Sequence, residues 1–443
     1  MGVSLVTIIG RGVIGKDTYK KTRYEFPDGS ISEETTIFSK ALIEKYKGNL
    51  DSIIVVGTET SSWSAILPDS ELEDEDSLAW KLYSNEAEKI PISAHNLEEL
   101  EVKLKEIYHC SVHILPPQKP DISQEEDELE IYSEVASYIK GSELILDITS
   151  GFRYMSMLLF QNLQSFFPSS SGYKVTMLYA EYDENLSHVR NMTSVWRAAE
   201  VNKALVTFKT TFNGVELIPF LKEKGYIKLA EWIGELSTNI SRNYIMAFDK
   251  VFFVRLKNLL SKEFHSIKLI KSPFVRETII FLRDSVVSKF DFQQENLSYY
   301  LLNFARILNE KQLFTQAIIA LRESLFTCIF ENCDSKQVGK YINMKDLNEK
   351  PEKNYYPEFK NICSEKYGKE FCNSIRDLNK LRNSIAHAGA DRVEEKPDMV
   401  EKKTDRVEKK LSENFDEYYN CVQIVYDEFN KKDGIFGYIK EHK

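Results

Sequence analysis

The first half of the chain alternates short apolar runs with longer amphipathic stretches. The apolar runs are continuous and rich in β-branched residues, a pattern typical of strands buried on both faces. They cover residues 5–9, 52–56, 112–115, 144–148 and 175–179. The stretches between them predict helices over residues 39–46, 77–89, 97–108, 125–139 and 154–167. Because alternating strands and helices build a parallel sheet covered by helices, the pattern predicts a Rossmann-like α/β domain. Residues 19–26, followed by Pro27-Asp28-Gly29, predict a hairpin inserted into this domain.

The second half of the chain has a different period. From about Trp196 the apolar positions recur with the 3.6-residue period of a helix. The predicted helices cover residues 229–236, 245–260, 275–287, 297–308 and 313–330. We therefore expect two domains: an α/β domain over residues 1–195 and an all-α region over residues 196–443.

In parallel α/β sheets, ligands bind at the carboxyl ends of the strands. The loops that follow three of the predicted strands are rich in glycine, arginine and hydroxyl residues. Glycine lets backbone N–H groups approach a phosphate, and arginine can grip a phosphate with two hydrogen bonds. The candidate ligand residues are Gly10, Arg11, Gly12, Thr58, Thr60, Ser61, Thr149, Ser150, Gly151, Arg153 and Tyr154. Any one such loop is more often an ordinary strand-to-helix turn, so the prediction depends on all three occurring together.

Composition and charge narrow the function classes. Apolar residues make up 42% and charged residues 28% of the chain, which is ordinary for a globular protein. The net charge of -10 argues against a broad basic groove for nucleic acid but leaves room for a small RNA site. The six cysteines form no CxxC pair and have no histidine at zinc-finger spacing, so we expect reduced thiols and no metal. No signal peptide or membrane span is predicted, which favours the cytoplasm.

One stretch of the all-α region combines a well-delimited helix with residues suited to catalysis. Residues 374–389 begin with a capping pattern at Ser374 and end at Gly389, with one apolar stripe between them. Arg382, Asn383 and His387 lie beside this stripe. Metal-free RNA cleavage must activate the ribose 2′-OH, stabilise the phosphorane charge and protonate the 5′-oxygen. A histidine can move protons, an arginine can stabilise the phosphorane, and an asparagine can orient the reacting group.

The spacing of these residues constrains how they act. His387 lies about 140° around the helix from Arg382, whereas Asn383 and His387 share a face. This geometry suits a site shared by two copies of the helix across a twofold axis. A histidine in a last helical turn is usually no more than a favourable charge for the helix dipole.

Taken together, the two halves resemble the CRISPR-associated CARF–HEPN ribonucleases of type III systems. Asp147-Ile148-Thr149-Ser150-Gly151-Phe152-Arg153 is similar to the family's D-[IV]-T-x-G-[FYW]-R loop, and residues 382–387 match the HEPN R-x4-H motif. Ala320-Leu321-Arg322-Glu323 resembles the helix that packs beside the motif helix in HEPN domains. The family often has histidine where this chain has Ser150, so the resemblance implies ligand binding but not chemistry on the ligand.

The resemblance implies a cyclic oligoadenylate as allosteric activator, with the tetra-adenylate favoured, and no further cofactor. This ligand would bind across a CARF dimer at the three loops. The resemblance also implies a homodimer or higher homo-oligomer that cuts single-stranded RNA without metal, using Arg382, Asn383 and His387. The expected function is a cyclic-oligoadenylate-activated endoribonuclease of type III CRISPR antiviral defence.

Three alternatives remain open at this point. The chain could be a non-catalytic nucleotide-sensing regulator whose helical domain binds a partner. It could be a nucleotide-dependent oxidoreductase, although Gly10-Arg11-Gly12 lacks the full dinucleotide pattern and its acidic partner. The sensor domain could also degrade its own ligand, although Lys16 is the only candidate base in its loops.

Overall fold

The computed structural model describes residues 2–12, 19–115, 133–151, 153–167, 172–262, 267–286, 296–332, 369, 373–374, 377–378 and 414–427. Arg382, Asn383 and His387 lie outside the described residues, as does Phe152 of the motif loop. The chain divides into two compact units, Met1–Asn202 and Lys203–Lys443.

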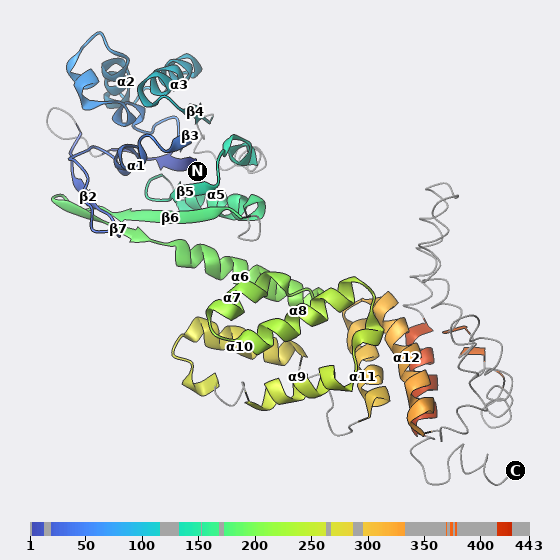
Figure 1. The fold of residues 1–443 in the computed structure, drawn as a ribbon. Helices are drawn as coiled ribbons and strands as arrows, with labels where there is room; N and C mark the ends of the chain where they lie inside the picture. The colour runs from blue at the N-terminus through green and yellow to red at the C-terminus, as the bar shows by residue number, and fades with distance from the viewer. Residues whose placement is uncertain are drawn as a thin grey trace, which may run out of the picture. The chain divides into compact units, whose positions relative to one another are not determined.

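The first unit is built on a seven-stranded sheet with the order β2-β7-β6-β5-β1-β3-β4 (Figure 1). The strands are β1 (Val3–Ile9), β2 (Arg23–Glu25), β3 (Leu50–Gly57), β4 (Ser111–Ile114), β5 (Glu143–Asp147), β6 (Lys174–Glu181) and β7 (Leu186–Asn191). Neighbouring strands are parallel except for β6 and β7. This sheet confirms the predicted Rossmann-like α/β class.

Helices bury both faces of the sheet, as the continuous apolar strands required. Alternate residues of β1 face opposite sides: Leu5 packs with α1 (Phe38–Tyr46), α2 (Leu78–Ala87) and α3 (Ala94–Tyr108). Val6 faces the other side, where it packs with α5 (Arg153–Phe166). Serine caps begin α2 and α3, because the hydroxyl of Ser77 accepts a hydrogen bond from Trp80 N and that of Ser93 accepts one from Asn96 N. Two short 3-10 helices, η1 (Trp63–Ile66) and η2 (Asp69–Glu73), lie between β3 and α2.

The edge formed by β2 and β7 differs from the sequence prediction. The inserted residues 19–35 do form antiparallel bridges, Thr22 with Thr35 and Glu25 with Ile31, but β2 also pairs in parallel with β7. Strand β7 itself was not predicted, because its alternating polar residues lack the continuous apolar run of the other strands. A strand with one exposed face does not need such a run.

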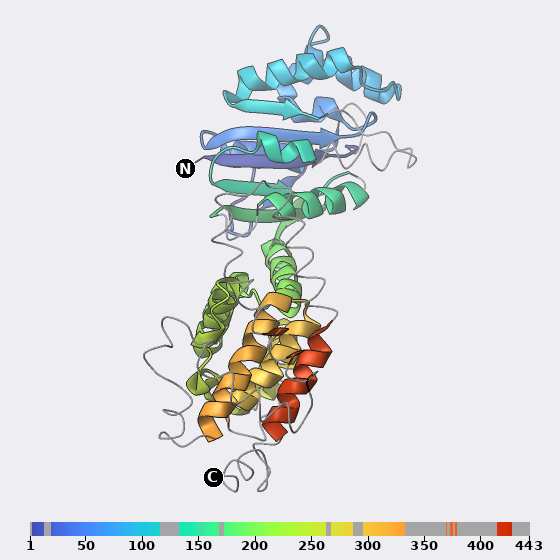
Figure 2. The ribbon, with the colours of Figure 1, turned by 90° about the vertical axis from the view of Figure 1, so that its right-hand side faces the viewer.

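The described part of the second unit is helical, as predicted. Its helices are α6 (Thr193–Thr211), which begins in the first unit, α7 (Ile218–Glu223), α8 (Ile227–Ser241), α9 (Lys250–Lys262), α10 (Pro273–Val286), α11 (Leu297–Glu310), α12 (Phe314–Asn332) and a helix over 414–427. Short 3-10 helices occur at Val215–Leu217, Ile245–Ala247 and Ile267–Leu269. Helices α11, α12 and 414–427 lie side by side (Figures 1 and 2), and the rings of Tyr299 and Tyr426 are 5.3 Å apart.

Candidate functional site

The three loops that the sequence predicted as ligand-binding meet at the carboxyl ends of the central strands of the sheet. Strands β5, β1 and β3 are adjacent and parallel, so their carboxyl ends lie side by side. The N–H of Ser62 donates to the carbonyl of Gly10 over 3.0 Å, and the N–H of Gly12 donates to Ser62 Oγ over 2.8 Å. A Cβ atom on Gly10 would lie 2.9 Å from the backbone nitrogen of Gly151. Only glycine at position 10 allows this close approach of the loops after β1 and β5.

Several of the hydroxyl residues hold the loops in shape. Ser61 is buried, and its hydroxyl donates to the carbonyl of Ile9 over 2.7 Å while accepting from Thr58 N over 2.8 Å. The hydroxyl of Thr149 accepts from the backbone N–H of Ala180 over 2.9 Å, which fastens this loop to β6. The side chains of Thr58, Ser61 and Thr149 therefore support the site from within more than they face a ligand.

Asp147, at the end of β5, was not among the sequence candidates although it supports one of the loops. Its carboxylate is fully buried and accepts from the Thr149 N–H over 2.8 Å and from the hydroxyl of Thr7 over 2.6 Å. Burial raises the pKa of this carboxyl group, and the hydrogen bonds from Thr149, Thr7 and Ser39 lower it in part. A carboxylate that ends an otherwise apolar strand is the sequence signal that identifies it.

The groups that remain accessible at these loops are suited to an anion. The side chains of Arg11 and Arg153 are exposed, and neither forms an ion pair with the residues that the structure describes. Arg11 donates from Nε to the carbonyl of Thr60 over 3.4 Å, and Arg153 is the first residue of α5. Ser150 is half-buried and Gly151 is exposed in the same loop, whereas the half-buried Tyr154 packs against the core beneath α5.

A cavity of about 130 Å³ lies beside these loops. The loops after β1 and β3 form one side of it, and the end of α2 forms the other side. Glu86 of α2 lines it. The Glu86 carboxylate accepts from the backbone N–H of Ser64 over 2.8 Å, from the Ser64 hydroxyl over 2.9 Å, and from the hydroxyl of Tyr19. Burial raises the pKa of Glu86. No sequence pattern had placed α2 at this site.

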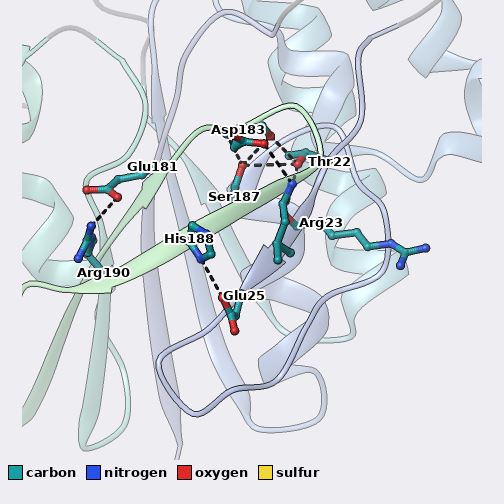
Figure 3. A network of polar contacts seen from close by, with 9 residues as sticks. Thr22, Arg23, Glu25, Glu181, Asp183, Ser187, His188 and Arg190 are labelled. Carbon is teal, nitrogen blue, oxygen red and sulfur yellow. Dashed lines mark hydrogen bonds and ion pairs between the residues drawn. The ribbon is translucent and has the colours of Figure 1, made fainter.

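On the neighbouring β6–β7 side, Arg190 and His188 are paired with carboxylates, whereas the guanidinium of Arg23 is exposed and has no partner among the residues drawn (Figure 3). Arg190 pairs with Glu181 over 2.9 Å, and His188 contacts Glu25 over 2.7 Å. The hydroxyl of Thr22 donates to the carbonyl of Asp183 over 2.8 Å, which ties the insertion to the β6–β7 turn.

The described residues nearest in sequence to the R-x4-H motif are helical. Ser374 and Leu378 belong to helical turns; the hydroxyl of Ser374 donates to Glu417 of the helix over 414–427, and Leu378 is fully buried. In α12, Arg322 and Glu323 form an ion pair of 2.7 Å in which each side chain is 14% exposed. Arg322 also lies over the ring of Phe326, 4.5 Å from its centroid.

Two features are absent from the described residues. No group of three or more His, Cys, Asp or Glu side chains there is arranged to hold a metal ion. None of the helices in the described ranges combines the length and the apolar character that crossing a membrane requires.

In this sheet, glycine, arginine and hydroxyl residues lie at the carboxyl ends of adjacent parallel strands. This arrangement defines an α/β ligand-binding domain. Comparison with protein families identifies which one: residues 4–184 match the model of CRISPR system endoribonuclease Csx1, CARF domain. These residues of the N-terminal unit are therefore a CRISPR-associated CARF domain. The match confirms the resemblance to the CARF–HEPN family over the N-terminal unit, and the R-x4-H motif lies beyond the matched residues.

No curated protein matches the chain. Among solved structures, the chain is similar to Csm6 of Enterococcus italicus bound to cyclic hexa-2'-fluoro-hexa-dAMP. The identity is 11% and the TM-score 0.38, over 100% of this chain and 98% of that chain.

Proposed function

We propose that this protein is a cyclic-oligoadenylate-activated, metal-independent endoribonuclease that cuts single-stranded RNA in the cytoplasm during type III CRISPR antiviral defence. The observation that carries the proposal is the CARF-domain match over residues 4–184, whose family model is that of an endoribonuclease. Residues 1–195 serve as the sensor, and residues 196–443 form a helical linker region and the HEPN nuclease. The active form is a homodimer or a higher homo-oligomer.

The ligand proposal is supported by the chemistry of the three loops. A cyclic oligoadenylate presents phosphates, riboses and adenine bases. Arg11 and Arg153 supply exposed guanidinium groups for phosphates, while Gly12 and Gly151 allow a close approach to the backbone. Thr60 and Ser150 lie in the same loops as hydrogen-bonding partners for riboses. The tetra-adenylate ring is the form we favour.

The catalytic proposal assigns one role to each residue of the R-x4-H motif. The ribose 2′-OH attacks the adjacent phosphorus, and the bond to the 5′-oxygen breaks, leaving a cyclic phosphate and a 5′-hydroxyl. His387 transfers the proton that this exchange requires, Arg382 stabilises the phosphorane charge, and Asn383 orients the reacting group. Since all three roles are filled by side chains of the protein, we expect the reaction to proceed in EDTA.

The test is cleavage of a labelled single-stranded RNA in EDTA, with and without cyclic tetra-adenylate. The wild type, His387→Ala and the control His95→Ala are compared. His95 is an exposed residue of α3 that contacts Glu99 and is not among the candidate residues of either site. We expect ligand to stimulate cleavage by the wild type and by His95→Ala. We expect cleavage by His387→Ala to fall by at least about 100-fold, the usual contribution of a general acid or base.

The other outcomes are equally informative. Ligand binding without cleavage under any condition would overturn the nuclease proposal in favour of a nucleotide-sensing regulator. Undiminished cleavage by His387→Ala would show that the site lies elsewhere. Cleavage that disappears in EDTA and returns with a divalent cation would contradict a metal-independent mechanism.

A further inference from the structure

The cavity beside the loops after β1 and β3 can enclose one ring of a base, with the rest of the base at its opening. Its volume is about 130 Å³, and apolar cavities of roughly 150 Å³ hold a benzene molecule. One wall consists of Arg11, Thr60 and Ser62, from the loops after β1 and β3. The opposite wall is the end of α2 with Asn85, so the cavity extends the candidate ligand site sideways.

The inner surface of the cavity suits a flat, apolar face. Ile90 and the half-buried Ile92 line it with accessible apolar side chains, and Ile90 is 46% exposed; the fully buried Trp63 supports them in the lining. The Trp63 ring is held in place because its Nε1–H donates to the carbonyl of Thr58 over 3.0 Å. Burying one face of a base against Ile90 and Ile92 removes apolar surface from water, which favours binding.

Glu86 lines the cavity, but its carboxylate is not available to hydrogen-bond a ligand. Its carboxylate already accepts hydrogen bonds from Ser64 and Tyr19. These bonds join α2 to η1 and to Tyr19, in the segment that leads to β2. Glu86 therefore fixes the wall of the cavity, and recognition falls to its neighbour in the sequence.

Asn85 has a side chain that can do this. The residue is half-buried, and its backbone carbonyl accepts from Ile90 N over 2.8 Å. Its side-chain amide forms no hydrogen bond with the described residues, so both its N–H donors and its carbonyl acceptor remain available. Asparagine pairs with adenine through two hydrogen bonds, accepting from the N6 amino group and donating to N7. On the corresponding edge guanine presents two acceptors, O6 and N7, and does not match this pair.

We propose that this cavity holds one adenine of the cyclic oligoadenylate, with Asn85 reading its N6–N7 edge. The exposed Arg11 at the cavity contacts a phosphate next to that adenine. The inference rests on the proposed ligand-sensing function and adds the means by which the sensor selects adenine. It also explains why α2, which carries none of the glycine-rich loops, packs against them.

The test measures binding to the full-length protein by isothermal titration calorimetry. Two probes are compared: cyclic tetra-adenylate and cyclic tetra-inosinate, in which an oxygen replaces the N6 amino group of each base. We expect the wild type to bind the adenine ring about 10-fold more tightly, the discrimination of a good bidentate pair. Asn85→Ala should lower the affinity for the adenine ring by a similar factor and bind both rings equally.

Asn49→Ala is the matched control, since this exposed asparagine precedes β3 at the opposite end of the strand. It should retain the affinity and the adenine preference of the wild type. A preference that survives in Asn85→Ala overturns the adenine pocket while ligand sensing stands. An equal loss of affinity for both rings in Asn85→Ala assigns Asn85 a structural role and overturns the pocket too. If the wild type binds neither ring, both the pocket and the proposed sensor function are wrong.

Discussion

At the scale of single residues, the sensor site depends on a carboxylate that no ligand needs to touch. Asp147 is fully buried at the end of β5, and its two oxygens accept from Thr149 N and from the hydroxyl of Thr7. Charge at such a depth is costly unless hydrogen bonds compensate for it. The arrangement holds the first residues of the loop that leads to Gly151 and Arg153.

Asp147 predicts a pH dependence of stability. Because its pKa is raised on folding, the folded state keeps this proton to higher pH than the unfolded state does. Unfolding then releases a proton, so the contribution of Asp147 to stability is lost as the pH rises from the ordinary value near 3.8 through the folded-state pKa. Asp147→Asn removes this dependence. Urea unfolding of both proteins across this interval should show the variant gaining stability relative to the wild type as the pH rises; parallel curves would contradict this.

At the scale of elements, the site consists of turns that are held in place by contacts with neighbouring strands and loops. The loop after β3 contacts the end of β1 through Ser61, and the loop after β5 passes close beneath it. Gly151 has a φ of +86°, and a Cβ atom there would lie 2.5 Å from Cγ2 of Ile8. The turn into α5 thus needs glycine both for its left-handed backbone and for its proximity to β1.

Replacing Gly48 and Gly151 separately distinguishes the cost of the left-handed backbone from the cost of the close approach to β1. Gly48 also has a positive φ, +86°, but nothing lies within 4 Å of the position of its Cβ atom. Gly48→Ala should cost only the left-handed conformation, about 1–2 kcal/mol. Gly151→Ala should cost more, because Ile8 must move, and should also weaken binding of cyclic tetra-adenylate. Chemical denaturation and calorimetry measure the two effects; equal costs with unchanged binding would show that the approach to Ile8 is unimportant.

At the scale of the whole molecule, ligand binding and RNA cleavage are assigned to different units. The groups proposed to bind the ligand lie within Met1–Asn202, whereas the R-x4-H motif belongs to the second unit. A ligand that binds only the folded state stabilises it, whether or not catalysis follows. Binding and catalysis should therefore be separable by mutation.

The expected result is a thermal shift that is independent of catalysis. Cyclic tetra-adenylate at about 100 times its dissociation constant should stabilise the folded protein by about 2.7 kcal/mol. His387→Ala should show the same shift as the wild type, and Arg11→Ala should show a smaller one. Differential scanning fluorimetry measures all three. A shift that vanishes in His387→Ala would mean that the nuclease motif contributes to ligand binding.

The loops were predictable from the sequence because the end of a buried strand is a local feature. The apolar runs stop at Gly10, Gly57 and Thr149, where the chemistry-bearing loops begin. The roles within the loops were not predictable. The same hydroxyl side chains look alike in sequence, yet Ser61 is tied inside the turn while Thr60 borders the cavity. Which one faces outward depends on hydrogen bonds to backbone groups of other strands.

The sequence by itself determined the two periodicities, hence an α/β half followed by helices, and the motifs that resemble the CARF–HEPN family. Both are local features that follow from the order of neighbouring residues. Only the tertiary structure decided that β1 lies between β5 and β3, that the strand β7 pairs with β2 at the sheet edge, and that Asn85 and Glu86 of α2 border the ligand loops. Such contacts join segments distant in the chain, and they arise from packing helices onto a sheet whose strand order no local pattern specifies.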